Sequence, residues 1–88
     1  MTKEWWLYVV RCAKGALYTG VSNDVEARVA KHNSGRGAKA VRALGTPVRL
    51  VLKTPVGTRR SAEALERVVK SLSKRDKERL VGMLGEGR

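Results

Sequence analysis

The chain has 88 residues, and 19 Lys or Arg against 8 Asp or Glu give it a formal net charge of +11, which favours a polyanionic partner such as nucleic acid. This length has room for one small core, so we expect a single domain over residues 1–88 and no second catalytic or targeting domain. The chain has no run near the roughly 20 apolar residues of a membrane span, no secretion signal, and a lone cysteine that excludes an internal disulfide, and these features predict a cytoplasmic protein without membrane contact.

The N-terminal part of the sequence predicts a β-hairpin. Residues 5–12 are rich in aromatic and β-branched side chains, residues 13–15 (Ala-Lys-Gly) form a turn signal, and residues 16–21 predict a second strand. Tyr8 and Tyr18 would then lie on two paired strands.

A short helix is predicted after the hairpin. Asn23 followed by Glu26 resembles a capping box, and the apolar spacing continues to about Asn33. Arg28 and His32 are four residues apart, which places them on the same face of this helix, one turn from each other.

Residues 34–47 predict a mobile basic loop, because glycines alternate there with Arg36, Lys39 and Arg42. They belong to a longer segment, residues 27–62, that contains no acidic residue. A solvated face usually mixes its signs, so we expect this basic segment to contact phosphate groups without sequence preference and in a salt-sensitive way. A ribosome-associated protein, or a merely basic soluble one, would have a similar charge balance.

The second half of the chain predicts a third strand and two helices. The strand covers residues 48–54 and is ended by Pro55. Ser61 is the expected cap of one helix, and Ser73 is the expected cap of a final helix that ends before Gly85. The apolar residues expected on the buried sides are Ala62, Leu65, Val69 and Leu72 in the first helix, and Leu80, Val81 and Leu84 in the second.

These elements follow the order β-β-α-β-α-α. The order fits an α/β (α+β) domain with a small, mainly antiparallel three-stranded sheet flanked by helices. The sequence contains no internal repeat and no linker.

The residues able to cleave a phosphodiester bond occur at a joint spacing. Tyr8 is followed by Tyr18-Thr19-Gly20, then by Arg28, His32 and, on a later predicted helix, Glu66. This pattern resembles the GIY-YIG endonuclease superfamily, in particular its small single-domain bacterial branch, the YhbQ-type proteins. The resemblance covers roughly residues 5–82 and continues through residues 34–39, 47–48 and 72–73.

The resemblance implies a role for each of these residues in DNA hydrolysis. Tyr8 would orient or deprotonate the attacking water, and Tyr18 would lie near the scissile phosphate. Arg28 would stabilise the charge of the transition state, and His32 would assist proton transfer or hold a tyrosine hydroxyl. Glu66 would bind the metal, since one carboxylate with waters and phosphate oxygens is a sufficient ligand set for Mg²⁺, or for Mn²⁺ in its place.

Further residues are candidates for contact with DNA. Gly20 lies at a strand end, where the absence of a side chain would let the backbone approach a phosphate. The other candidates are Arg36, Lys39, Arg42 and Lys70. Branched, single-stranded and damaged DNA all remain open as substrates, as does a role in DNA repair, and a protein partner could supply specificity.

Other interpretations remain open from the residues alone. Tyr8 and Tyr18 could be half-buried strand residues, and Glu66 could be a surface carboxylate paired with Lys70. No asparagine follows Asn33, where many members of the superfamily carry one after the metal helix. This departure favours the alternative of a catalytically weak nucleic-acid-binding module with the same fold. A third hypothesis is a subunit that recruits a catalytic partner.

Overall fold

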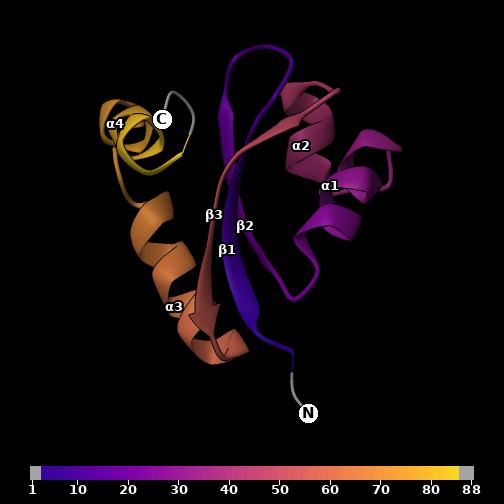
Figure 1. Ribbon diagram of the computed structural model, residues 1–88. Coiled ribbons are helices and arrows are strands. Elements are labelled where there is room, and N and C mark those ends of the chain that lie inside the picture. The colour runs from indigo at the N-terminus through magenta and orange to yellow at the C-terminus, as the bar shows by residue number, and fades with distance from the viewer. Residues whose placement is uncertain (1–2, 86–88) are drawn as a thin grey trace.

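The computed structural model describes residues 3–85 and contains three strands and four helices (Figure 1). In chain order the elements are β1 (Trp5–Arg11), β2 (Leu17–Ser22), α1 (Val25–Asn33), α2 (Lys39–Leu44), β3 (Arg49–Gly57), α3 (Arg59–Lys70) and α4 (Lys74–Leu84).

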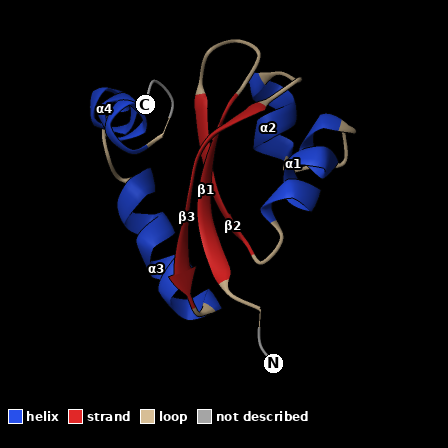
Figure 2. Cartoon of the chain, viewed as in Figure 1, coloured by secondary structure: helices blue, strands red, loops and turns tan. Residues whose placement is uncertain are grey.

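The three strands form one antiparallel sheet in the order β2-β1-β3, so that β1 is central and the other two strands are edges. Helices α1 and α2 cover one face of the sheet, and α3 and α4 cover the other (Figures 1 and 2). The predicted fold class and sheet are therefore confirmed. The predicted order is also recovered, with one further helix, α2, between α1 and β3.

Each face of the sheet has its own apolar core, because successive residues of a strand point to opposite faces. Leu7 and Val9 of β1 belong to the core under α3 and α4, together with Val51, Leu52, Val69 and Val81. Val10 belongs to the core under α1 and α2, together with Cys12, Val41 and Val48. Tyr8 lies between Leu7 and Val9 in the strand and so faces α1.

The prediction of a loop over residues 34–47 is wrong for its second half, where α2 forms. Val41 is fully buried against Val10, and Ala38 and Leu44 pack around it at a spacing of three residues. This spacing is helical, and the burial of the apolar side stabilises a helix that its basic residues and the glycines on either side of it had masked in the sequence.

The third strand is longer than predicted, since β3 continues through Pro55 to Gly57. Proline lacks the N–H of a ladder hydrogen bond, but β3 is an edge strand, where a proline is tolerated.

Two helix starts also differ from the prediction. The side chain of Asp24 caps α1, and that of Thr58 caps α3, each by accepting a hydrogen bond from a backbone N–H three residues on.

Two predictions of burial and one strand boundary need correction. Leu65 of α3 is 36% exposed and Leu84 of α4 is 59% exposed, although both were expected on buried sides. Cys12 follows β1 rather than ending it, and it is buried.

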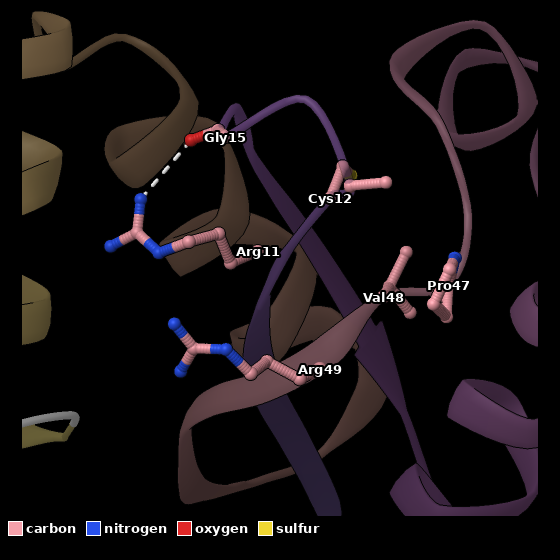
Figure 3. Close-up of a pocket in the computed structure, with 7 residues that line it drawn as sticks. Arg11, Cys12, Gly15, Pro47, Val48 and Arg49 are labelled. Atoms are coloured by element: carbon pink, nitrogen blue, oxygen red, sulfur yellow. Dashed lines mark hydrogen bonds between the residues drawn. The ribbon is translucent and has the colours of Figure 1, made fainter.

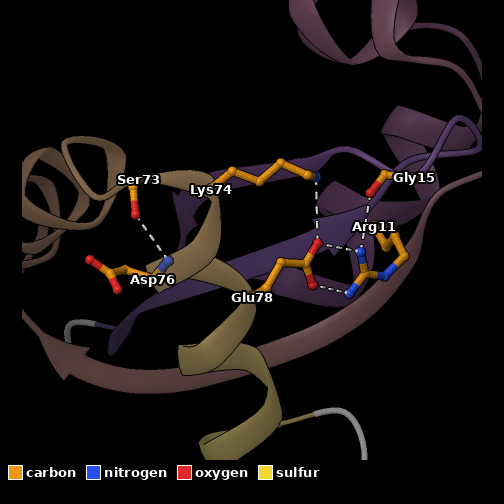
Figure 4. Close-up of polar contacts among 6 residues, drawn as sticks. All are labelled: Arg11, Gly15, Ser73, Lys74, Asp76 and Glu78. Carbon is orange, nitrogen blue, oxygen red and sulfur yellow. Dashed lines mark hydrogen bonds and ion pairs between the residues drawn. The ribbon is translucent and has the colours of Figure 1, made fainter.

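The predicted start of α4 is confirmed, because the Ser73 hydroxyl accepts a hydrogen bond from the Asp76 backbone N–H at 3.1 Å (Figure 4).

Two polar contacts fasten helices to the sheet. The Asn33 side chain at the end of α1 accepts from the backbone N–H of Val48 at 2.6 Å and donates to its carbonyl at 3.1 Å. On the other face, Arg11 of β1 makes a bidentate ion pair with Glu78 of α4 at 2.8 and 2.9 Å (Figure 4).

Between residues 3 and 85, no helix has the length and apolar character that a membrane crossing requires.

Candidate active site

The centre of the candidate site is a buried pair of side chains, Tyr8 and His32. Tyr8 is 1% exposed and His32 is fully buried, and the Tyr8 hydroxyl lies 2.9 Å from His32 Nε2. Val25 and His32 fall on one stripe of α1, seven residues apart, and both are buried. Helical periodicity therefore directs the imidazole toward β1, where strand alternation has directed Tyr8 toward α1.

Two glycines lie against this pair. Gly20 is the partner of Tyr8 in the β1–β2 register, and a Cβ atom added to it would be 2.5 Å from the Tyr8 hydroxyl oxygen. A Cβ added to Gly37 would overlap His32 Nδ1. We predicted that Gly20 makes room for a phosphate, but the group that the structure places beside it is the Tyr8 ring. The role of Gly37 was missed, since nothing in the sequence shows that this glycine returns to α1.

Tyr18 joins the two helical layers at the edge of the sheet. Its ring meets the His32 ring edge to face, with 5.6 Å between ring centroids. On its other side, the Lys70 ammonium of α3 lies 5.8 Å from the Tyr18 ring centroid and forms an ion pair with Glu66 at 3.2 Å. Because β2 is an edge strand, residues from α1 and α3 reach the same tyrosine.

Arg28 influences the acid–base properties of the buried pair. Burial raises the pKa of Tyr8, while a hydrogen bond with Arg28 and its charge lower that pKa; the charges of Tyr18 and Glu66 raise it. Burial also lowers the pKa of His32, and the cationic side chains of Arg28 and Lys31 lower it further. His32 is therefore neutral at pH 7. The five predicted catalytic residues thus lie close enough to influence one another.

Glu66 could hold a metal ion. It is the carboxylate of the candidate-site cluster, which consists of Tyr8, Tyr18, Arg28, His32, Glu66 and Lys70. Its side chain is 20% exposed, and within residues 3–85 no three His, Cys, Asp or Glu side chains come together as a ready-made ligand set. A site with one carboxylate suits Mg²⁺, which keeps several waters and completes its shell with substrate phosphates. The residues present fit such an ion, once Lys70 releases the carboxylate.

The basic candidates for DNA contact fall into two groups. Lys70 belongs to the cluster, beside Glu66 and Tyr18. Arg36, Lys39 and Arg42 are exposed, and they lie along the segment from the end of α1 through α2. A further lysine was not singled out from the sequence. Lys53 is the partner of Tyr8 in the β1–β3 register, and it forms an ion pair with Glu26 at 2.7 Å.

Two pockets of the molecule lie away from this cluster. One is lined by Arg11, Cys12, Ala13, Gly15, Pro47, Val48 and Arg49, at the hairpin end of the sheet (Figure 3). Another is lined by residues 3–5 and 57–59, at the opposite end. Neither includes Tyr8 or His32, which are buried. Tyr18 and Glu66 are half-buried and Lys70 is exposed, so these three residues form the accessible rim of the cluster.

Comparison with known proteins relates the sequence to a described family. The family model of the GIY-YIG catalytic domain matches residues 4–79. The chain is 52% identical over 77 residues to the UPF0213 protein YhbQ of Escherichia coli (strain K12), which covers 88% of this chain and 76% of that protein. It is 47% identical over 79 residues to a UPF0213 protein of Cronobacter sakazakii, which covers 90% of this chain and 82% of the relative.

Two solved structures have the same fold. The solution NMR structure of the UPF0213 protein BH0048 from Bacillus halodurans has a TM-score of 0.62 and 40% sequence identity, with 94% of this chain and 87% of that chain covered. The solution NMR structure of the protein EF2693 from E. faecalis has a TM-score of 0.62 and 33% identity, with 93% and 86% covered. The names of these proteins state no substrate.

Proposed function

Because this chain belongs to the GIY-YIG catalytic domain family, we propose that it is an endonuclease that hydrolyses DNA phosphodiester bonds with a divalent metal ion. The observation that carries the proposal is the position of Tyr18, which contacts His32 of α1 on one side and Lys70 of α3 on the other. This contact joins the buried pair to the ion pair that contains Glu66. A base, cations and a metal-binding carboxylate are the groups that phosphodiester hydrolysis requires.

In this proposal the tyrosines and Arg28 act on the attacking water and the phosphate. Tyr8 orients or deprotonates the water, and its hydrogen bond with His32 holds the hydroxyl in place. Burial keeps Tyr8 protonated at neutral pH, so its action as a base depends on the cationic Arg28, which lowers the pKa. Arg28 also stabilises the charge of the transition state, and Tyr18 lies beside the scissile phosphate.

Glu66 is the proposed metal ligand, with Mg²⁺ or Mn²⁺ as the ion. A bound divalent ion supplies positive charge that polarises the phosphate. The ion pair between Glu66 and Lys70 holds the carboxylate at the rim of the cluster. Lys70, once released from Glu66, would contact a phosphate of the substrate.

The substrate is a polyanion that contacts a broad basic surface. Arg36, Lys39 and Arg42 follow the helix that carries Arg28 and His32, so they lie on the segment next to the proposed reaction centre. Phosphate contacts of this kind are insensitive to sequence, and their strength falls as salt is added. We further propose a cytoplasmic setting, in which the single cysteine stays reduced, and specificity supplied by DNA shape or by a protein partner.

A second candidate function is a nucleic-acid-binding module with little catalysis. The observation that favours it is the burial of Tyr8, because a side chain that is 1% exposed must be uncovered before it can act on water. The lack of an asparagine after Asn33 points the same way. Salt-dependent binding without cleavage would support this function.

The deciding experiment compares cleavage of labelled single-stranded, duplex and branched DNA at low salt with Mg²⁺ or Mn²⁺. The variants are Tyr8→Phe and Glu66→Ala, with Glu63→Ala as the matched control, because Glu63 lies one turn earlier on α3 and pairs with the surface residue Arg59. We expect the wild type and Glu63→Ala to cut, and Tyr8→Phe and Glu66→Ala to lose cleavage while binding DNA.

Two results would contradict the endonuclease. Cleavage by Glu66→Ala at the wild-type rate would exclude Glu66 as the metal ligand and indicate a contaminating nuclease. DNA binding without cleavage by the wild type in either metal would favour the binding module.

A further inference from the structure

The imidazole of His32 has one nitrogen that is paired and one that is not. Nε2 lies 2.9 Å from the Tyr8 hydroxyl oxygen, whereas Nδ1 is buried and has no hydrogen-bond partner among residues 3–85. Buried polar atoms are almost always paired, so an unpaired nitrogen at the centre of the candidate site calls for a physical explanation.

The backbone of Gly37 covers this nitrogen. A Cβ atom built on Gly37 would overlap His32 Nδ1 and lie 2.7 Å from His32 Cα and 2.9 Å from His32 Cγ. The backbone of Gly37 does not have a positive φ angle, in contrast to Gly35, so glycine is required here for space and not for its conformation. The Gly37 backbone therefore lies directly against the Nδ1 edge of the ring.

The contact decides which nitrogen carries the proton. Burial lowers the pKa of His32, so the ring is neutral and has a single N–H group. An N–H at Nδ1 would point at the Gly37 backbone and find no acceptor, and a buried donor without an acceptor is strongly disfavoured. A bare lone pair at Nδ1 instead faces the Cα–H group of Gly37, which is a weak donor.

We propose that Gly37 holds His32 in the Nε2–H tautomer, so that His32 donates its hydrogen bond to the Tyr8 oxygen and Gly37 is a positioning residue for Tyr8. The catalytic part of this inference rests on the proposed function. Since Nε2 already carries a proton, His32 does not take one from Tyr8. Once its hydroxyl is uncovered, Tyr8 gives its own proton to water, and the N–H of His32 stabilises the negative charge on the oxygen when that proton is absent.

The tautomer can be measured directly, because the sequence contains one histidine. Protein labelled with ¹⁵N-histidine gives a single pair of imidazole nitrogen signals, and long-range ¹H–¹⁵N spectra at pH 7 distinguish the two neutral tautomers. We expect a protonated Nε2 and an unprotonated Nδ1, with a shift of the Nε2–H signal in Tyr8→Phe. A protonated Nδ1 would overturn the inference.

The role of Gly37 is tested with Gly37→Ala, and Gly82→Ala is the control, because a Cβ at Gly82 meets no atom of the described part of the chain within 4 Å. We expect Gly37→Ala to move both imidazole signals and to lower kcat about 10²-fold, as a misplacement of roughly 1 Å in an active site does, with little change in KM. Unchanged signals and unchanged kcat would overturn the role.

Failure of this inference and failure of the proposed function are distinguishable. If the wild type cleaves no DNA, the endonuclease is wrong, but the imidazole signals still test the tautomer and the effect of Gly37→Ala on them. If Gly37→Ala does not fold, the tautomer of the wild type decides the inference alone.

Discussion

Substitution of Gly20 by alanine tests the packing that holds Tyr8 in place. The added Cβ would lie 2.5 Å from the Tyr8 hydroxyl oxygen and 2.6 Å from Cζ, both closer than non-bonded atoms approach. Overpacking of a buried site costs about 1–3 kcal/mol. Alanine is favoured over glycine in a strand by roughly 0.5–1 kcal/mol, which offsets part of this cost.

The expected net effect of Gly20→Ala is therefore a loss of about 1–2 kcal/mol in the free energy of unfolding. In a domain of this size the loss corresponds to a fall in Tm of roughly 5–15 °C. Circular dichroism during thermal unfolding measures it, and urea denaturation gives the free energy independently. Gly82→Ala is the matched control, and it should raise Tm, because the helix gains the alanine preference without any overlap.

A double-mutant cycle separates the hydroxyl from the ring. Tyr8→Phe removes the closest overlapping atom but leaves Cζ, so the cost of Gly20→Ala should be smaller in the Tyr8→Phe background without vanishing. A Gly20→Ala protein as stable as the wild type, or costs that add without coupling, would refute the placement of Tyr8 against Gly20.

Three further predictions address other parts of the molecule. Hydrogen bonding with Arg11 is the main cause that lowers the pKa of Glu78 from 4.5 to about 2, so the ion pair stabilises the fold above pH 4.5 and is lost as the pH falls toward 2. The difference in Tm between wild type and Glu78→Gln should therefore be largest at neutral pH and shrink over that window, and a constant difference would contradict the assignment. Val41→Ala should lower the free energy of unfolding, measured by urea denaturation, by about 2 kcal/mol, because two buried methyl groups are lost and leave a cavity. A loss under about 0.5 kcal/mol would argue against the packing of α2. Lys70→Met should lower the Mg²⁺ concentration for half-maximal cleavage about two-fold, because an ion pair worth roughly 0.5 kcal/mol no longer competes for Glu66. An unchanged or higher Mg²⁺ concentration for half-maximal cleavage would contradict the metal role of Glu66.

The contact between Tyr8 and His32 shows how far local patterns reach. Strand alternation places Tyr8 on the face opposite to Leu7 and Val9, and helical spacing places His32 on the same stripe as Val25. Both periods are properties of the backbone and can be read from a few consecutive residues. The resemblance to a known superfamily then indicated that the two side chains belong to one site.

Helix α2 shows where such patterns fail. Its residues include basic side chains between glycines, which is the composition of a loop, and it is only six residues long. An isolated helix of this length is unstable in water. It forms because Val41 is buried against Val10 on a strand more than thirty residues earlier, and no short window of sequence contains that contact.

The sequence by itself determined most of the elements: three strands, the helices α1, α3 and α4, and the positions of Tyr8, Tyr18, Arg28, His32 and Glu66 on them. The tertiary structure alone decided which atoms meet. It placed Lys70 beside Tyr18 around the edge of β2, and Gly37 against His32 Nδ1. The physical reason is that the hydrogen-bonding periods of helices and strands are local, whereas close packing depends on how distant segments return to one another.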